Sequence, residues 1–315
     1  MASSLLKHTD LELLLVPKEF SAWQRLQEDD TRSIEKKTGH TVHSRGLGEL
    51  SEQSLIRWAG SKRKILPVLA DFWTAKHTRY VEPFAGSAAL FFHLRPAAAL
   101  LGDLNQDLID TYRVIREYPD TVHDLASRHS ANARTYYRIR SWQPDTLDEI
   151  ERAVRFIYLN RNCFNGIYRT NKRGNFNVPF GGKKLSQLPD VSTFRRCALL
   201  LSNAKLQACD FGTTLARTRK GDFVYIDPPY TTRSRRVFKS YGPKEFSFTD
   251  LDRLLGHLTR MHERGVDFVV SYDDCAEARE LSQKWTTERI SVRRHVAGFV
   301  SSRRSAKELL ITNMR

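Results

Sequence analysis

The sequence has 315 residues and a formal net charge of +15. This length allows one large α/β domain or two smaller ones with a buried core, and the charge favours a polyanionic partner, nucleic acid before an anionic membrane surface. Residues 1–55 contain 7 Lys and Arg and 9 Asp and Glu, which leaves 44 basic and 27 acidic residues, a net charge of +17, for residues 56–315. We therefore expect the basic surface on the body of the protein.

Cysteine usage and hydropathy exclude several other classes. The four cysteines (Cys163, Cys197, Cys209 and Cys275) are widely spaced, with no C-x-x-C pair, so neither a zinc site nor a disulfide framework is expected. No apolar run approaches the roughly 20 residues of a membrane span, and the N-terminus lacks the features of a secretion signal. We expect a reduced, cytoplasmic protein without a metal or a membrane partner.

The chain opens with a leucine-rich, net acidic extension over residues 1–55, for which we predict packing or partner docking rather than chemistry. The loop Trp58-Ala-Gly-Ser-Lys62 follows and enters a predicted helix over Lys64–Phe72. Such a loop can present backbone N–H groups and a lysine to an anion. The alternative is a buried tryptophan beside a solvated basic turn.

A strand, a turn of small residues and a helix are predicted over Arg79–Leu90, where the turn contains Gly86 as its one glycine. The dinucleotide fingerprint G-x-G-x-x-G is therefore absent. A second short strand, Ala99–Asn105, contains Asp103 near its end, and an acid at that place can bind ribose hydroxyls. A nucleoside-containing cofactor without a pyrophosphate clamp fits this pair, which favours S-adenosylmethionine over a nicotinamide or flavin dinucleotide.

Helical patterns dominate from Leu108 to Leu201, with predicted helices over Leu108–Glu117, Leu147–Leu159 and Val191–Leu201. Residues 160–184 interrupt them with a segment rich in Asn, Arg, Lys, Phe and Tyr. Asn and Arg side chains can read the edges of adenine and guanine, and aromatic side chains can wedge or stack. We predict DNA contact by this segment; the alternative is a structural hairpin.

Strand character returns over Leu206–Phe211, where Asp210 could accept from an adenine amine and Phe211 could pack on the ring, or Asp210 could simply cap a helix. The next predicted strand, Asp222–Ile226, ends at Asp227-Pro-Pro-Tyr230 because consecutive prolines cannot continue a sheet ladder. The Asp227 carboxylate and the adjacent proline carbonyl can together accept both hydrogens of an exocyclic amine. An aromatic ring two residues further on suits a nucleobase; the alternative is an ordinary strand end.

The remaining predicted elements complete a sheet after a basic loop. The loop contains Arg233, Arg235 and Arg236, which we expect to contact phosphates. The predicted elements are a helix over Leu251–Glu263 and strands over Val266–Ser271, Arg289–Arg294 and Lys307–Thr312.

Residues 56–315 together resemble the Dam-type family of adenine-N6 DNA methyltransferases (D12 class, α group). Five motifs carry the resemblance in order: Arg57-Trp-Ala-Gly-Ser-Lys62, Glu82-Pro-Phe84-Ala-Gly86, Gly102-Asp103-Leu-Asn105, Asn165-Gly-Ile167-Tyr168-Arg169 through Phe176-Asn-Val-Pro-Phe-Gly181, and Asp227-Pro228-Pro229-Tyr230. Two positions depart from the pattern, because relatives usually have glycine where Ala88 stands and commonly where Ser61 stands. The first departure is expected to alter cofactor affinity.

The resemblance implies a Rossmann-like methyltransferase sheet, mostly parallel with one antiparallel strand. Its catalytic domain would comprise residues 56–107 and 206–315, and a helical target-recognition domain with a hairpin would comprise residues 108–205. The implied residues for S-adenosylmethionine are Trp58, Lys62, Glu82, Phe84, Gly86, Asp103, Asp210, Phe211 and Asp227. Those implied for DNA are Arg57, Asn165, Ile167, Tyr168, Arg169, Asn171, Lys172 and Arg173, with Arg233, Arg235 and Arg236 from the basic loop.

The expected reaction is methyl transfer to N6 of a flipped adenine in duplex DNA, with Asp227, Pro228, Pro229 and Tyr230 as the catalytic group and GATC as the first expected site. Asp before Pro-Pro-Tyr favours adenine by resemblance, while N4-cytosine or an RNA amine stays open as the target. A catalytically weak or dead methylase-fold DNA-binding protein is the alternative from another class. A cognate restriction enzyme is a possible partner, and a prokaryotic or phage nucleoid is the expected location.

Overall fold

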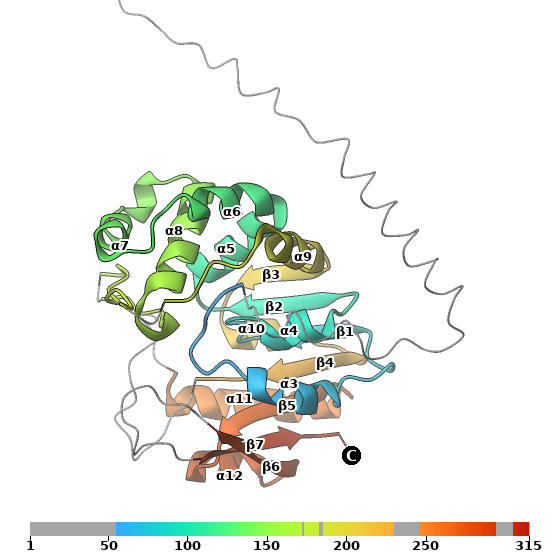
Figure 1. The fold of residues 1–315 in the computed structure, drawn as a ribbon. Helices are drawn as coiled ribbons and strands as arrows, with labels where there is room; N and C mark the ends of the chain where they lie inside the picture. Colours follow the sequence, from blue (N-terminus) through green and yellow to red (C-terminus); the bar gives the residue numbers. More distant parts are fainter. Residues whose placement is uncertain (1–54, 172, 183–184, 230–245, 294–304, 315) are drawn as a thin grey trace, which may run out of the picture. The chain divides into compact units, whose positions relative to one another are not determined.

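The computed structural model describes residues 55–171, 173–182, 185–229, 246–293 and 305–314. These residues form a seven-stranded sheet in the order β3-β2-β1-β4-β5-β7-β6 (Figure 1). The strands are β1 (Arg79–Glu82), β2 (Ala99–Asp103), β3 (Ala204–Ala208), β4 (Asp222–Ile226), β5 (Asp267–Asp273), β6 (Thr286–Arg293) and β7 (Ser305–Thr312). Strands β1 to β5 pair in parallel, and β7 is antiparallel to both β5 and β6. The predicted Rossmann-like sheet with one reversed strand is confirmed.

The strand order fixes where a ligand would meet the sheet. From β1 the chain proceeds outward to β2 and β3, whereas β4 begins the other half on the opposite side of β1. The carboxyl ends of β1 and β4 therefore adjoin at the point where the winding reverses, which is where open α/β sheets bind ligands. Every residue of β4 is buried, as expected for a central strand covered on both faces.

Helices occupy the chain between β2 and β3 and lie beside these two strands in Figure 1. They are α5 (Gln106–Glu117), α6 (Pro119–Ser127), α7 (Ala133–Arg140), α8 (Glu149–Asn162) and α9 (Val191–Ser202). The three predicted helices correspond to α5, α8 and α9 within three residues at each end. A capping box of Asp148 and Glu151 starts α8, whose last ten residues are all buried.

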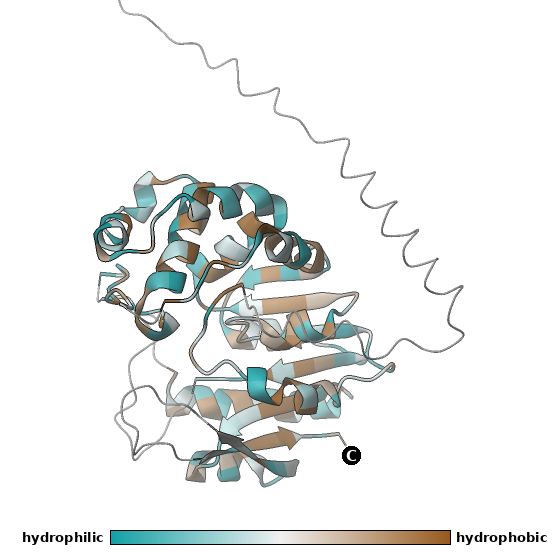
Figure 2. Ribbon diagram, in the orientation of Figure 1, coloured by the Kyte–Doolittle hydropathy of each residue, from teal (hydrophilic) through white to brown (hydrophobic). Residues whose placement is uncertain are grey.

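The other helices precede β1 or connect consecutive strands. They are α3 (Leu66–Ala70), which follows the short 3-10 helix η1 (Arg63–Ile65), α4 (Ala89–Leu94), α10 (Phe211–Ala216), α11 (Phe248–Glu263) and α12 (Ala276–Ser282). Figure 2 shows that the helices carry both hydrophobic and hydrophilic residues, as is typical of helices that pack one face against a sheet. One prediction was wrong: the strand expected over Leu206–Phe211 ends at Ala208, because Asp210 accepts from the Gly212 N–H and starts α10.

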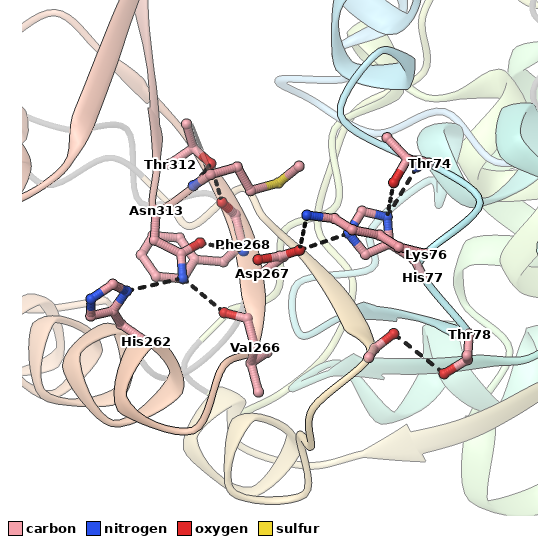
Figure 3. A network of polar contacts seen from close by, with 12 residues as sticks. Thr74, Lys76, His77, Thr78, His262, Val266, Asp267, Phe268, Thr312 and Asn313 are labelled. Carbon is pink, nitrogen blue, oxygen red and sulfur yellow. Dashed lines mark hydrogen bonds and ion pairs between the residues drawn. The ribbon is translucent and has the colours of Figure 1, made fainter.

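At the amino ends of β4 and β5, a polar network ties loops to the sheet (Figure 3). The N–H of Thr74 donates to His77 Nδ1 at 3.0 Å, which leaves the proton of the neutral ring on Nε2, and Nε2 donates to Asp267 at 3.0 Å. Lys76 also contacts Asp267, at 2.8 Å. Burial pushes the pKa of Asp267 upward, but hydrogen bonds from Lys76 and His77 outweigh it and lower the pKa. This edge of the sheet lies opposite the carboxyl ends of the parallel strands, and its hydrogen bonds connect the loop before β1 with the start of β5.

None of the helices in the described part of the chain combines the length and hydrophobicity that a bilayer crossing requires. The predictions for residues 1–54, for Lys172 and Tyr230, and for Arg233, Arg235 and Arg236 fall outside the described residues.

Candidate active site

A buried acid lies at the carboxyl end of β1. Glu82, the last residue of β1, is 3 % exposed and accepts a hydrogen bond of 2.9 Å from the Tyr80 hydroxyl. Burial raises the pKa of Glu82 well above its usual value, the Tyr80 hydrogen bond opposes the rise, and the charges of Asp227 and Asp103 add to it. Three acids from three adjacent strand ends therefore influence one another at this edge.

The turn after β1, residues 83–87, is joined to the end of β2. The Gly86 N–H donates to Asp103 Oδ2 at 3.0 Å, and the Asn105 N–H donates to Asp103 Oδ1 at 2.9 Å. The Tyr112 hydroxyl of α5 donates to the Gly86 carbonyl at 2.8 Å. Burial raises the pKa of Asp103, and the backbone N–H groups partly offset this. The turn and the acid predicted to bind one cofactor are thus directly bonded.

Gly86 also explains where Trp58 lies. Gly86 has φ +47°, and a Cβ built on it would come within 2.7 Å of Trp58 Cδ1. The indole stacks on the Tyr168 ring with centroids 5.9 Å apart and planes 21° apart. Only glycine allows the turn and the indole to approach this closely, so Trp58 packs directly against the turn after β1.

Asp227, directly after β4, is held by three side-chain bonds. Lys62 Nζ lies 2.7 Å from Oδ1 and 2.8 Å from Oδ2 and also donates to the Gly60 carbonyl at 3.1 Å. Ser271 of β5 donates to Oδ1 at 3.1 Å, and its oxygen is 3.0 Å from the Tyr225 hydroxyl. Lys62 is 7 % exposed and Asp227 21 %, so the pair is mostly but not wholly shielded from water.

Asp227 and Lys62 were predicted, whereas Ser271 and Tyr225 were not. Ser271 and Tyr225 lie in strands that read simply as buried, and no local motif marks them. Of the two prolines, Pro228 is buried and Pro229 partly exposed.

Asp210 and Phe211 start α10 beside the turn after β1. The Phe211 ring stacks on Phe84 of that turn with centroids 5.3 Å apart and planes 25° apart. Asp210 Oδ1 accepts from the Gly212 N–H at 2.9 Å and from Arg253 Nη2 at 2.5 Å. Asp210 therefore does cap a helix, and it stands next to the turn as well. Among the described residues, no group of three or more His, Cys, Asp or Glu side chains could hold a metal ion.

Residues 58–297 match the family model of the D12 class N6 adenine-specific DNA methyltransferases, and this span contains every contact just described. The chain belongs to this family.

Three relatives show how far the likeness extends. The chain is 34 % identical over 274 residues to the type II methyltransferase M1.LlaDCHI of Lactococcus lactis subsp. cremoris, covering 84 % of this chain and 96 % of the relative. It is 31 % identical over 265 residues to the DNA adenine methylase of Escherichia coli strain K12, covering 82 % and 94 %. It is 30 % identical over 238 residues to the type II methyltransferase M.MjaIII of Methanocaldococcus jannaschii, covering 69 % and 82 %.

In this D12-class methyltransferase, the segment predicted to contact DNA begins with a tie to the first motif. Asn160 accepts from the Arg57 N–H at 2.8 Å and donates to the Arg57 carbonyl at 2.7 Å. Gly166, at φ +64°, leaves no room for a Cβ beside the Arg57 side chain, and Asn165 before it adopts φ +55°. The two DNA-contact candidates Arg57 and Asn165 are thus brought to one place.

The rest of the segment turns back on itself. Thr170 and Phe176 form an antiparallel bridge, and Cys163 and Phe180 form another. Arg169 Nε donates to Asn177 Oδ1 at 2.8 Å, across this hairpin.

The tip of the hairpin is exposed. The Asn171 side chain accepts from the N–H groups of Arg173 and Asn175 and so closes the tip. Asn171 and Arg173 are exposed, whereas Ile167 is partly buried.

Tyr168 is the DNA-contact candidate that lies inside. It is 9 % exposed, its ring lies between those of Trp58 and Phe156, and its hydroxyl donates to Asp107 at 2.6 Å. Burial raises the pKa of Tyr168, and the charge of Asp107 adds to the rise. In this structure the Tyr168 ring packs against the Trp58 indole, and little of its side chain is exposed for contact with DNA.

Arg57, a predicted DNA-contact residue, lies in a cluster with Arg63 and Arg161 that the sequence did not predict. Arg161 is 5 % exposed and donates to the Ser186 hydroxyl at 2.8 Å. Burial, with the charges of Arg63 and Arg57, lowers the pKa of Arg161 to about 9. Arg63 has a lowered pKa for the same two reasons, burial first and Arg57 second. Three guanidinium groups thus concentrate positive charge beside the first motif, a feature that comes from tertiary contact between residues a hundred positions apart.

Proposed function

We propose that this chain transfers a methyl group from S-adenosylmethionine to N6 of an adenine extruded from duplex DNA. The observation that carries the proposal is the Asp227 carboxylate, fixed by Lys62 and Ser271 at the reversal point of the sheet. The turn that bonds Asp103 lies at the end of the neighbouring strand β1. An acceptor for an amine and a site for a nucleoside cofactor are therefore expected side by side.

The residues at the turn suit this cofactor. Trp58 packs directly against Gly86, so the turn presents backbone rather than a side chain at this place, and Asp103 is an acceptor fixed for hydroxyl groups such as those of a ribose. Glu82, Phe84, Asp210, Phe211 and Lys62 complete the set that would hold it. When bound, the cofactor supplies a methyl group that carries the electrophilic character of a sulfonium centre.

The residues of the chain would make the adenine amine more nucleophilic. An adenine amine is a weak nucleophile because its lone pair is delocalised into the ring. A carboxylate has about four lone-pair sites, and the described residues occupy two on Oδ1 and one on Oδ2 of Asp227. One acceptor site thus stays available on Oδ2, and with the Pro228 carbonyl it would accept both amine hydrogens and localise the lone pair on nitrogen.

Extruding the base has a cost that other residues would offset. Flipping costs a few kcal/mol, and stacking on an aromatic ring returns about 1–3 kcal/mol. Tyr230 is the ring that we assign to this stacking. Phosphate contacts from the body, whose net charge is +17, would supply the remainder and make binding depend strongly on salt.

We further assign target recognition to residues 108–205 and catalysis to residues 56–107 and 206–315. Arg57, Asn165, Ile167, Arg169, Asn171, Lys172 and Arg173, with Arg233, Arg235 and Arg236, are the DNA-contact residues that we propose. GATC is the recognition site to test first. A cytoplasmic, nucleoid-associated enzyme, with or without a cognate restriction enzyme, fits this activity.

The experiment compares wild-type protein, Asp227→Ala and Asp267→Ala with tritiated S-adenosylmethionine and a GATC duplex. Asp267 is a matched control because it also pairs with a lysine, Lys76, is 25 % exposed and lies at the opposite edge of the sheet. We expect Asp227→Ala to lose at least hundredfold in turnover, the scale of losing a fixed polar group in a transition state, while DNA affinity at constant salt stays within a few fold.

Asp267→Ala should keep wild-type turnover. Mass spectrometry of the digested product should show N6-methyladenine. Near wild-type turnover by Asp227→Ala would reject the assigned role, and N4-methylcytosine would reject the assigned target.

A further inference from the structure

One arginine outside the motifs contacts the residues at the start of α10. Arg253, in the second turn of α11, places Nη2 at 2.5 Å from Asp210 Oδ1 and Nη1 at 3.4 Å from Oδ2. Its guanidinium carbon lies 4.7 Å from the centre of the Phe211 ring. Nη1 also donates to Asp250 Oδ1 at 2.6 Å. The guanidinium is thus held on two carboxylates and one aromatic face.

The ion pair between Arg253 and Asp210 contributes little to stability. The side chain of Arg253 is 42 % exposed and that of Asp210 33 %, and ion pairs at such exposure contribute only about 0–1 kcal/mol. The apolar contacts of Phe211 with Phe84, Phe246 and His257 hold the ring without Arg253. Arg253 instead fixes the orientation of the Asp210 carboxylate, because a planar guanidinium sets the plane of the carboxylate that it contacts.

The orientation of the Asp210 carboxylate decides which of its oxygens can accept a hydrogen bond from a ligand. Oδ1 of Asp210 accepts from both the Gly212 N–H and Arg253, whereas within the described residues Oδ2 has only the long contact to Nη1. Oδ2 therefore keeps the free acceptor capacity of this carboxylate among the described residues. A 6-amino purine would donate to it, whereas a 6-oxo purine would set its own acceptor against the carboxylate.

We propose that Arg253 is a positioning residue for the cofactor's adenine and determines selectivity for a 6-amino purine over a 6-oxo purine. The inference rests on the proposed function, because it needs Asp210 to face that base. Arg253 has donors only, so it cannot accept from the amine and acts through Asp210.

The test measures binding rather than activity. Calorimetry with S-adenosylhomocysteine and S-inosylhomocysteine, which differ only at the 6 position of the base, gives two affinities for each variant. We expect wild-type protein to prefer the amino compound at least tenfold. Arg253→Met should bind it about fivefold to tenfold more weakly, the scale of one typical hydrogen bond, and should lose most of the preference. Arg253→Lys should fall between them, since lysine keeps the charge without the planar fork.

The matched control is Arg260→Met, which removes the same charge from an exposed position two turns further along α11. It should leave both affinities unchanged, and the thermal midpoints of all variants should stay within a few degrees of wild type. If wild-type protein binds neither compound, the proposed function itself fails. If it binds with the preference and Arg253→Met keeps both affinity and preference, only the inference is overturned. Tighter binding by Arg253→Met would also overturn it, because the guanidinium would then occupy the place of the base.

Discussion

Replacing Gly86 by alanine tests whether the turn after β1 is built around one missing side chain. Alanine at φ +47° costs about 1–2 kcal/mol, because its Cβ approaches the following carbonyl in the left-handed region. The new Cβ would also meet Trp58 Cδ1 at 2.7 Å, and relieving such overpacking costs about 1–3 kcal/mol. The lower entropy of unfolded alanine returns roughly 0.5–1 kcal/mol. We expect a net loss of about 2–4 kcal/mol in the free energy of unfolding.

Gly174→Ala is the matched control for this loss. Gly174 has φ +80°, and a Cβ there would have nothing within 4 Å, so its variant carries the backbone strain without the collision. Urea denaturation should place Gly174→Ala within about 1 kcal/mol of wild type and Gly86→Ala clearly below it. Because Gly86 N–H bonds Asp103, calorimetry should also show cofactor affinity reduced at least tenfold in Gly86→Ala alone. Equal stability of the two variants with undiminished cofactor binding would refute the reasoning.

Two further predictions concern buried titratable groups. Burial raises the pKa of Cys163 to about 11 and that of Cys197 to about 12. Both thiols should therefore resist a thiol reagent at pH 8 until the chain unfolds. Mass spectrometry counts the modified cysteines, and rapid reaction of all four in the native protein would contradict this expectation. Burial also raises the pKa of Tyr158 to about 12, whereas an unfolded tyrosine titrates near 10. The unfolded chain therefore releases this proton first, so stability from Tyr158 is complete below pH 10 and falls as pH rises toward 12. Tyr158→Phe should flatten that fall in urea titrations at alkaline pH, and an unchanged slope would show that Tyr158 does not cause it.

The sequence predicted the parts of the fold that local patterns determine. The apolar runs of β4 and β5 and the polar stop at Asp227 needed only periodicity and the chemistry of proline. The strand predicted through Phe211 failed because Asp210 is a good helix cap, and capping decided the backbone there.

The candidate site was predictable where a motif is contiguous and not where it is assembled by folding. Lys62 and Asp227 could be named from their motifs, but their direct bond joins residues 165 positions apart. Ser271 and Arg253 sit in stretches that read as a buried strand and an ordinary amphipathic helix, and Arg161 sits in the segment predicted to contact DNA without being named as a contact itself. Their relevance comes from what the sheet order and helix packing place opposite them, which one sequence read locally does not contain.

Ala88 shows how a departure from the family pattern can leave the turn intact. It adopts φ +48° at a position where the resemblance predicts glycine, and the left-handed conformation costs alanine about 1–2 kcal/mol. Its methyl group is fully buried in the core, which returns about 0.8 kcal/mol, and alanine avoids the roughly 0.5–1 kcal/mol of extra backbone entropy that glycine loses on folding. These terms nearly cancel, so either residue supports the same backbone at this position. Gly86 has no such compensation because Trp58 occupies the space a methyl group would need, and the sensitivity of the turn is therefore concentrated at residue 86.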